Sequence, residues 1–317
     1  MAKKTAKKKP VPKKTSKKKA SPAGKKKVSP TDNALAALTE FIRVTSTVLP
    51  ADVRRAVAKA KGEELPDTTA AYAMGIITDN IKLAEEKSQP MCQDTGTVIF
   101  YVYHPPGFHQ TPFLKLIHKA VTNATKKGYL RQHSVNSLNG DNAGTNLGPG
   151  HPSVHFVEHA QKDVVMKMML KGGGCENVSA QYSLPDTGLS AGRDLAGVRK
   201  VILDAVIKAQ GKGCGPGILG VCIGGDRADS ASFAKKQLFR KLDDKSPLKE
   251  LAVLEGEIVE TCNKLGIGPM GFGGKTTLLG CKIDHLNRLP ASFFVSISYM
   301  CWAFRRQGIV LDSKTMA

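Results

Sequence analysis

Several short apolar runs, bordered by glycine-rich or polar segments, constrain the fold of this 317-residue chain more than any other feature. Runs of this length and composition are typical of strands buried in a sheet. Three of them carry a cysteine at one edge: Cys92 before 98–103, Cys214 before 218–223 and Cys301 after 293–299. The chain is therefore expected to bury several strands and to carry reactive side chains where those strands begin or end.

Helical and strand-like patterns alternate along the rest of the chain. Apolar residues at helical spacing predict helices over residues 31–48, 51–61, 68–87, 111–127, 192–210, 230–242 and 247–265. Strands are predicted over residues 98–103, 154–157, 163–170, 218–223, 275–283 and 293–299. This order predicts an α/β (mixed α+β) fold, in which helices flank mixed sheets and the first three helices form an N-terminal packing element.

The composition is that of a globular protein with a sizeable core. The chain is 41% hydrophobic and 23% charged, and its length suits one large or two modest domains. It has no run of about eighteen apolar residues and no apolar signal core, so neither a membrane span nor export is expected. Seven cysteines without the framework of a small disulfide-rich domain favour a reducing compartment, and we expect the protein in the cytoplasm.

The N-terminal segment differs in composition from everything that follows it. Residues 1–28 contain thirteen lysines and no acidic residue, and these lysines account for most of the net charge of +20. A segment so rich in Lys, Ala, Pro, Ser and Thr cannot bury enough apolar surface to fold. We therefore expect a disordered lysine-rich tail over residues 1–30 and a folded domain over residues 31–317. The tail either contacts polyanions or is a solubilising extension.

Three segments beside the predicted strands carry groups suited to chemistry. Cys92, Gln93 and Asp94 place a soft metal ligand, an amide and a possible proton carrier in consecutive positions. The glycine triplet 172–174 either exposes backbone N–H groups to a ligand or forms a flexible turn. The long irregular stretch 131–150 is rich in turn formers, which is typical of functional loops.

Spacing alone identifies neither a metal site nor a nucleophile. The three strand-edge cysteines are far apart in sequence and form no CxxC pattern, so a zinc finger or a ferredoxin-like site is not supported. Cys222, Cys262 and Cys281 lie inside apolar segments and are expected in the core. Ser190 lies in a GxSxG match, but this match does not leave a strand directly, as a nucleophile elbow must.

Five motifs occur here in order: MCQDTGTVIFYV, YLRQHSVN with GDNAGTN, KGGGCEN, GCGPGILGVCIGGDR and GIGPMGFGGKTT. From about residue 33 to residue 307 the chain resembles the α subunit, or N-terminal domain, of class I fumarate hydratases and L(+)-tartrate dehydratases. The resemblance implies a hydro-lyase with a [4Fe-4S] cluster that interconverts fumarate and (S)-malate. The nearest alternative is an L(+)-tartrate dehydratase α subunit, which forms oxaloacetate. An alternative of another class is a nucleic-acid-associated protein that acts through the lysine-rich tail.

The resemblance also implies which residues form the site. The positions that match the family's cluster ligands are Cys92, Cys214 and Cys301. The positions that match its contacts with a small dicarboxylate substrate are Gln93, Asp94, Arg131, Gly173 and Gly174. With three protein ligands, one iron keeps an open position and can act as a Lewis acid. Asp94 is the candidate catalytic residue for proton transfer.

Two residues depart from the family pattern. Leu289 stands where relatives commonly carry a substrate-site histidine, and Cys175 stands where the KGGGS motif carries a serine. Single-chain members of the family also carry a C-terminal β domain with further substrate residues. Because this chain stops at Ala317, about where an α subunit ends, we expect a separately encoded β subunit and an α2β2 assembly.

Overall fold

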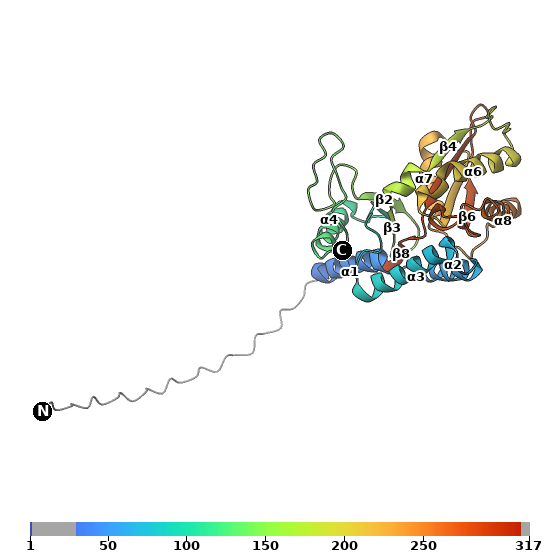
Figure 1. Cartoon of the computed structure of the whole chain (residues 1–317). Coiled ribbons are helices and arrows are strands. Elements are labelled where there is room, and N and C mark those ends of the chain that lie inside the picture. Colours follow the sequence, from blue (N-terminus) through green and yellow to red (C-terminus); the bar gives the residue numbers. More distant parts are fainter. Residues whose placement is uncertain (2–29, 312–317) are drawn as a thin grey trace.

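The computed structural model describes Met1 and residues 30–311, and it places their strands in two four-stranded sheets (Figure 1). The expected tail over residues 1–30 lies almost wholly outside the described residues. The helices and sheets confirm the predicted mixed α/β class, because each sheet combines parallel and antiparallel pairs and is covered by helices.

The first sheet has the strand order β2-β1-β3-β8. Its strands are β1 (Thr97–His104), β2 (Ser153–Glu158), β3 (Val164–Lys171) and β8 (Arg306–Leu311). β1 pairs in parallel with β2, and the other pairs are antiparallel. Side chains alternate across a strand, so Val98 and Phe100 join the core under α1 (Pro30–Thr47) and α4 (Gln110–Lys126), while Ile99 and Tyr101 face the opposite side.

The second sheet has the strand order β4-β7-β5-β6. Its strands are β4 (Ala180–Ser183), β5 (Gly217–Ile223), β6 (Leu278–His285) and β7 (Phe294–Met300). One face packs against α6 (Leu195–Ala209) and α8 (Lys249–Asn263) through the buried side chains of Leu219, Val221 and Val295. The other face approaches α7 (Arg227–Gln237) so closely that a Cβ on Gly220 would lie 2.3 Å from the Ala234 carbonyl oxygen.

A shared core joins the two sheets above α2 (Ala51–Glu63) and α3 (Thr69–Lys87), which run along the lower side of Figure 1. Buried side chains from both sheets and from α3 meet there, namely Met74, Met169, Ile218 and Met300. This packing brings the end of β3, the start of β5 and the end of β7 to one junction. The glycine-rich and cysteine-bearing loops at these strand ends are therefore neighbours.

Three elements of the structure were not predicted. The strand β4 and the strand β8 were missed, and the short helix α5 (Gly173–Asn177) replaces the flexible turn that was one interpretation of the glycine triplet. The predicted strand over 275–283 begins only at Leu278, because the backbone N–H groups of Lys275 and Thr276 donate to the Glu64 carboxylate instead of to a neighbouring strand.

One stretch of the described residues, Asp32–Glu63, has the length and the mean hydropathy of 1.2 that a membrane span would need. Half of the most apolar 18-residue segment of this stretch is buried inside the protein. Pro50 divides the stretch between α1 and α2, whose residues Ile42 and Val53 are both buried in the core. The core helices of a globular protein pass the same test, so this is weak evidence for a span.

Candidate active site

The Cys92 loop connects α3 to β1 and is pressed against the end of β3. Gly96 has a φ of +73°, and a Cβ on it would lie 2.1 Å from the Lys171 carbonyl oxygen, so only glycine fits. On the other side, the Asn80 amide donates to the Met91 carbonyl at 2.8 Å. The backbone on both sides of Cys92 is thereby fixed, and its thiol is half-buried.

Cys214 lies in the turn that follows the short helix η1 (Gln210–Gly213), with a left-handed φ of 55°. The buried ring of Tyr299 forms the floor of this turn. A Cβ on Gly213 or on Gly217 would lie 2.3 Å from Tyr299 atoms, so the loop can close over the ring only with glycine at both positions. The Cys214 carbonyl accepts a hydrogen bond from the Trp302 N–H, which ties this turn to the segment that carries Cys301.

Cys301 follows β7, is buried, and shares a hydrogen bond with Cys175 of α5. This hydrogen bond, together with burial, raises the pKa of Cys301 well above the usual range of a thiol. Burial also raises the pKa of Cys214, and the neighbouring charges of Cys175, Cys92 and Asp94 add to the effect. The three predicted ligand cysteines therefore lie close enough for the charge of one to affect the pKa of another, and Cys175 is a fourth thiol beside them.

Cys175 differs from the cysteines of the core. Its hydrogen bond with Cys301 and the positive charges of Lys171 and Arg305 outweigh burial and lower the pKa of its thiol to about 7. By contrast, burial raises the pKa of Cys222 to about 11 and that of Cys262 to about 12. The predicted core cysteines are indeed buried, at 2% exposure or less. The Cys175 thiol is therefore chemically distinct from the core thiols of β5 and α8.

Asp94 bridges three loops of the site. Its Oδ2 accepts a hydrogen bond from the Gly173 N–H at 2.7 Å, and its own N–H donates to the Cys92 Sγ at 3.4 Å. Its Oδ1 lies 3.3 Å from the His133 Nδ1, and both side chains are about one-third exposed. One carboxylate oxygen is thus anchored to the backbone, while the other faces an imidazole and solvent. His133 was not predicted as a site residue; only its place in the irregular stretch pointed to it.

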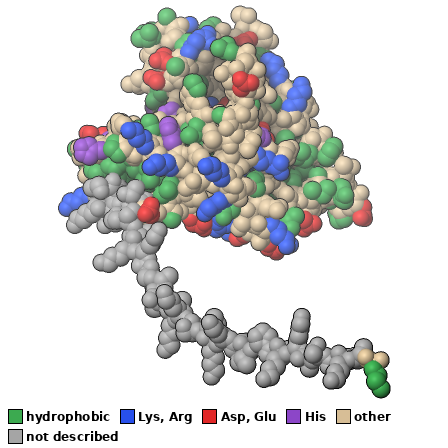
Figure 2. All heavy atoms as spheres, turned by 90° about the vertical axis from the view of Figure 1, so that its left-hand side faces the viewer, with side chains coloured by type: hydrophobic (Ala, Val, Ile, Leu, Met, Phe, Trp, Pro, Cys, Tyr) green, Lys and Arg blue, Asp and Glu red, His purple; other side chains and the backbone are tan. Residues whose placement is uncertain are grey.

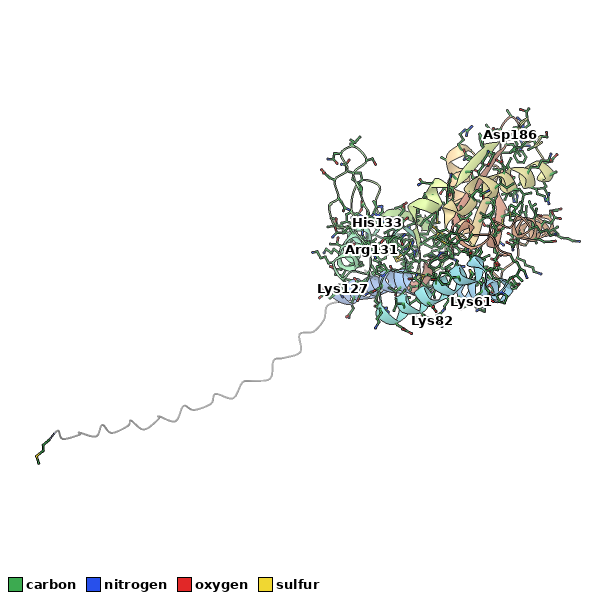
Figure 3. All side chains as sticks on the ribbon, in the orientation of Figure 1. Lys61, Lys82, Lys127, Arg131, His133 and Asp186 are labelled. Atoms are coloured by element: carbon green, nitrogen blue, oxygen red, sulfur yellow. The ribbon has the colours of Figure 1, made fainter. Side chains whose placement is uncertain are left out.

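Arg131 lies at the foot of the loop that projects from the first sheet, next to His133 (Figure 3). Its N–H donates to the Thr95 hydroxyl at 2.8 Å, and its side chain is exposed. The buried Asn146 holds this segment, because its amide donates to the Arg131 carbonyl at 2.7 Å and its Oδ1 accepts the N–H of His133 at 2.8 Å. The loop therefore presents Arg131 beside the Cys92–Asp94 segment.

The remaining predicted substrate contacts lie at the same junction. Gln93 is exposed, and its Oε1 lies 3.7 Å from the Cys92 Sγ. Gly174 is the second residue of α5, after Gly173, and a Cβ on it would lie 3.6 Å from the Lys212 carbonyl oxygen in η1. Leu289 is 73% exposed in the loop before β7, and the structure places no histidine in its position.

Two buried cations close to the thiols were not predicted as site residues. Lys171 is fully buried and donates to the Tyr299 carbonyl at 2.7 Å, with the Glu176 carboxylate at 3.5 Å, and burial lowers its pKa. Arg305 is 1% exposed and interacts with both Cys175 and Cys301 through its charge. Their proximity depends on packing between distant segments, and only their adjacency to the glycine triplet and to Cys301 pointed to them.

The other candidate chemistries find no support in the described residues. Ser190 lies in a turn closed by the Asp186–Ala191 bridge, with a φ of 48°, and Figure 3 shows Asp186 at the far tip of the second sheet. Within residues 30–311, no three His, Cys, Asp or Glu side chains are placed to hold a single metal ion. The face seen in Figure 2 carries scattered Lys and Arg side chains and no continuous basic patch.

A model of the fumarate hydratase (Fumerase) family matches residues 35–310, which is most of the chain. The chain belongs to this family. It is 53% identical over 279 residues to a Geobacillus stearothermophilus protein provisionally assigned as fumarate hydratase class I. That alignment covers 87% of this chain but only 54% of the relative, so the chain spans about half the length of that fumarate hydratase.

Relatives named as α subunits are covered almost completely. The chain is 34% identical over 285 residues to a Methanocaldococcus jannaschii protein provisionally assigned as L(+)-tartrate dehydratase subunit alpha, covering 87% of this chain and 98% of the relative. It is 30% identical over 279 residues to the L(+)-tartrate dehydratase subunit alpha of Escherichia coli K12, covering 87% and 90%. The predicted family resemblance is thereby confirmed.

Proposed function

We propose that this chain is the α subunit of a [4Fe-4S] fumarate hydratase that interconverts fumarate and (S)-malate. The observation that carries the proposal is the convergence of Cys92, Cys214 and Cys301 beside Asp94 and Arg131. Fumarate is favoured over L(+)-tartrate because the relative assigned as a fumarate hydratase is 53% identical, against 30% to 34% for those named for tartrate dehydratase. An L(+)-tartrate dehydratase α subunit that forms oxaloacetate is the second candidate.

The residues at the junction fit an iron–sulfur cluster better than a single ion. In a cluster each thiolate binds a different iron atom, so thiols from separate loops can serve without meeting at one point. Cys92, Cys214 and Cys301 have this disposition, since each comes from a different loop and interacts with its neighbours through charge. When bound, the cluster supplies an open iron that acts as a Lewis acid on the substrate hydroxyl.

The chain's own residues would bind the dicarboxylate and move the proton. The exposed Arg131 guanidinium has the planar geometry that suits a carboxylate. The Asp94 Oδ1 would hold the proton, because its Oδ2 is already engaged by the Gly173 N–H. His133, 3.3 Å from that Oδ1, would exchange the proton with solvent. Gln93 and the backbone of Gly173 and Gly174 would complete the contacts with the substrate.

We further propose that a separately encoded β subunit completes the site in an α2β2 assembly, in the cytoplasm. The relatives named as α subunits, which this chain covers almost completely, support a separate partner. The projecting loop supports a contact with a partner, since the loop that begins at Arg131 also carries Leu138, 97% exposed, and Val135, 53% exposed. A partner that covered both side chains would remove this apolar surface from water.

An anaerobic assay of the two-subunit enzyme tests this function. The chain would be co-expressed with its β subunit and assayed with fumarate, (S)-malate and L(+)-tartrate. We expect reversible conversion of fumarate and (S)-malate with a higher kcat/KM than that for L(+)-tartrate. Preference for L(+)-tartrate would support the second candidate, and loss of all activity on deletion of residues 1–28, with the cluster retained, would favour a role for the tail.

A further inference from the structure

Arg305 is the largest fully buried side chain of the described residues, at 1% exposure, and the two terminal nitrogens of its guanidinium have no hydrogen-bond partner there. Its Nε donates to the Ala303 carbonyl at 3.3 Å, while Nη1 and Nη2 have no acceptor within the described part of the chain. Its backbone is held by hydrogen bonds that join Leu170 of β3 to the segment after β7. The position of this side chain is therefore fixed by both sheets.

A buried guanidinium whose terminal N–H groups lack acceptors lowers the stability of the fold, because a charge removed from water must be paired or hydrogen-bonded. The adjacent Arg306 has such partners: it donates to the Asp52 carboxylate and to the carbonyls of Leu238 and Arg240. The terminal nitrogens of Arg305 share none of these acceptors. Arg306 is satisfied within the protein, whereas the terminal nitrogens of Arg305 are not. This difference indicates that the acceptor of Arg305 is a group that the folded chain alone does not supply.

Arg305 follows the predicted ligand Cys301 by four residues, and its charge interacts with two thiols. Its charge lowers the pKa of both Cys175 and Cys301, although other interactions keep the pKa of Cys301 high. The other buried cation at the junction, Lys171, already donates to the Tyr299 carbonyl and the Ser179 hydroxyl and pairs with Glu176. Of these two buried cations, only Arg305 therefore keeps terminal N–H groups without an acceptor among the described residues.

We propose that Arg305 is a positioning residue that donates its Nη–H groups to sulfur atoms of the cluster site at Cys301 and is the built-in counter-cation of the cluster. This inference rests on the proposed iron–sulfur function. Hydrogen bonds to cluster sulfur and nearby positive charge raise the reduction potential of such a centre. Arg305 therefore stabilises the reduced, more negative form of the cluster relative to the oxidised form.

Pulsed EPR on the reduced, full-length protein tests the contact directly. Arginine labelled with ¹⁵N in the guanidinium would be incorporated, and we expect a weakly coupled ¹⁵N at the cluster. Arg305→Lys should remove this coupling, and Arg131→Lys should preserve it. The inference about Arg305 is overturned if the wild-type spectrum lacks the ¹⁵N coupling, or if the coupling survives in Arg305→Lys. If the wild-type chain takes up no cluster, the proposed iron–sulfur function is overturned as well.

The midpoint potential of the cluster gives a second, independent readout. Arg305→Met removes the charge and should make one-electron reduction about tenfold less favourable, which is a shift of about 59 mV to more negative potential. Arg305→Lys keeps the charge and should shift the potential less. Arg199→Gln, which removes a half-buried arginine bonded to Thr261 instead, should leave it unchanged. Equal potentials in the wild type and the Arg305→Met variant overturn the inference.

Discussion

At the scale of single residues, the two oxygens of Asp94 have different environments. Oδ2 accepts the Gly173 N–H at 2.7 Å, and Oδ1 faces His133 at 3.3 Å. A carboxylate held on one side and open on the other is suited to carry a proton in a fixed position. The two partners of this side chain come from two other segments of the chain, so its geometry depends on the junction between the sheets.

Replacing Asp94 with Asn tests its catalytic role. The amide keeps an oxygen for the Gly173 N–H but cannot carry the proton, so kcat should fall by a factor of about 10² to 10⁴. Steady-state kinetics of the anaerobic two-subunit enzyme would measure the change, with iron content as the check on the cluster. Asp141→Asn, in the exposed part of the projecting loop, is the matched control and should leave kcat unchanged. An unaltered kcat in Asp94→Asn would remove Asp94 from the mechanism.

Gly96 and Gly128 separate the cost of backbone conformation from the cost of crowding. Both have a positive φ, of +73° and +77°. They differ in crowding: a Cβ on Gly96 would lie 2.1 Å from the Lys171 carbonyl oxygen, whereas a Cβ on Gly128 would meet no atom within 4 Å. Gly96→Ala should therefore lower the free energy of unfolding by about 3 kcal/mol, and Gly128→Ala by about 1 kcal/mol. Urea unfolding would measure both, and equal effects would contradict the close approach of the Cys92 loop to β3.

At the scale of secondary-structure elements, a buried ion pair joins α2 to β8. The Asp52 carboxylate bonds the Arg306 guanidinium at 2.5 Å and accepts the Leu242 N–H at 2.9 Å. Burial alone would raise the pKa of Asp52, but these two partners outweigh burial and lower it. A carboxyl group with a lowered pKa in the folded state stabilises the fold above its unfolded pKa and loses that contribution as the pH falls through the folded pKa.

Stability should therefore depend on this pair at acidic pH. In the wild-type protein the Asp52–Arg306 pair should contribute fully to the free energy of unfolding above about pH 4, where unfolded aspartate is ionised. This contribution should be lost on further acidification. Asp52→Asn should be less stable by about 3 kcal/mol at pH 7 and should lose less stability between pH 4 and pH 2. Thermal unfolding across this range is the measurement. Parallel pH profiles for the two proteins would exclude the ion pair as a source of the acid sensitivity.

Most of the secondary structure followed from apolar periodicity, and the exceptions have physical causes. The helices and the longer strands bury regular apolar faces, which the sequence displays directly. β4 has only four residues, all but one partly buried, and β8 begins with Arg306 and contains Gly308, so neither has a clear strand pattern. α5 begins with two glycines, which disfavour a helix by propensity. β4 is set by pairing with β7, β8 by pairing with β3, and α5 by packing against β7, and local sequence encodes none of these contacts.

The candidate site was predictable only in part, for a similar reason. Motifs within one loop, such as Cys92 with Asp94, are visible in the sequence. Contacts between loops are not: the hydrogen bond of Cys175 with Cys301 and the unpaired guanidinium of Arg305 arise where α5 meets the end of β7. The resemblance supplied the ligand set and singled out Cys175 as an extra thiol, and the structure adds the hydrogen bond of that thiol with Cys301 and the buried cations beside it.

At the scale of the whole molecule, the site lies where the two sheets share a core. The Cys92 loop leads into the first sheet, while Cys214 and Cys301 border strands of the second. A cluster held by all three would link the sheets across their junction. Gln93 and Arg131, at the foot of the projecting loop, are the exposed residues beside this junction, and a β subunit that completes the site would contact them.

Iron content after anaerobic reconstitution tests this account most directly. Wild-type chain should take up about four irons with broad visible absorption. Cys92→Ser, Cys214→Ser and Cys301→Ser should each abolish the cluster. Cys175→Ser, which alters the thiol bonded to Cys301, and the core variant Cys222→Ser should each retain about four irons. A normal cluster in any of the three ligand variants, or its loss in Cys175→Ser, would contradict the assignment.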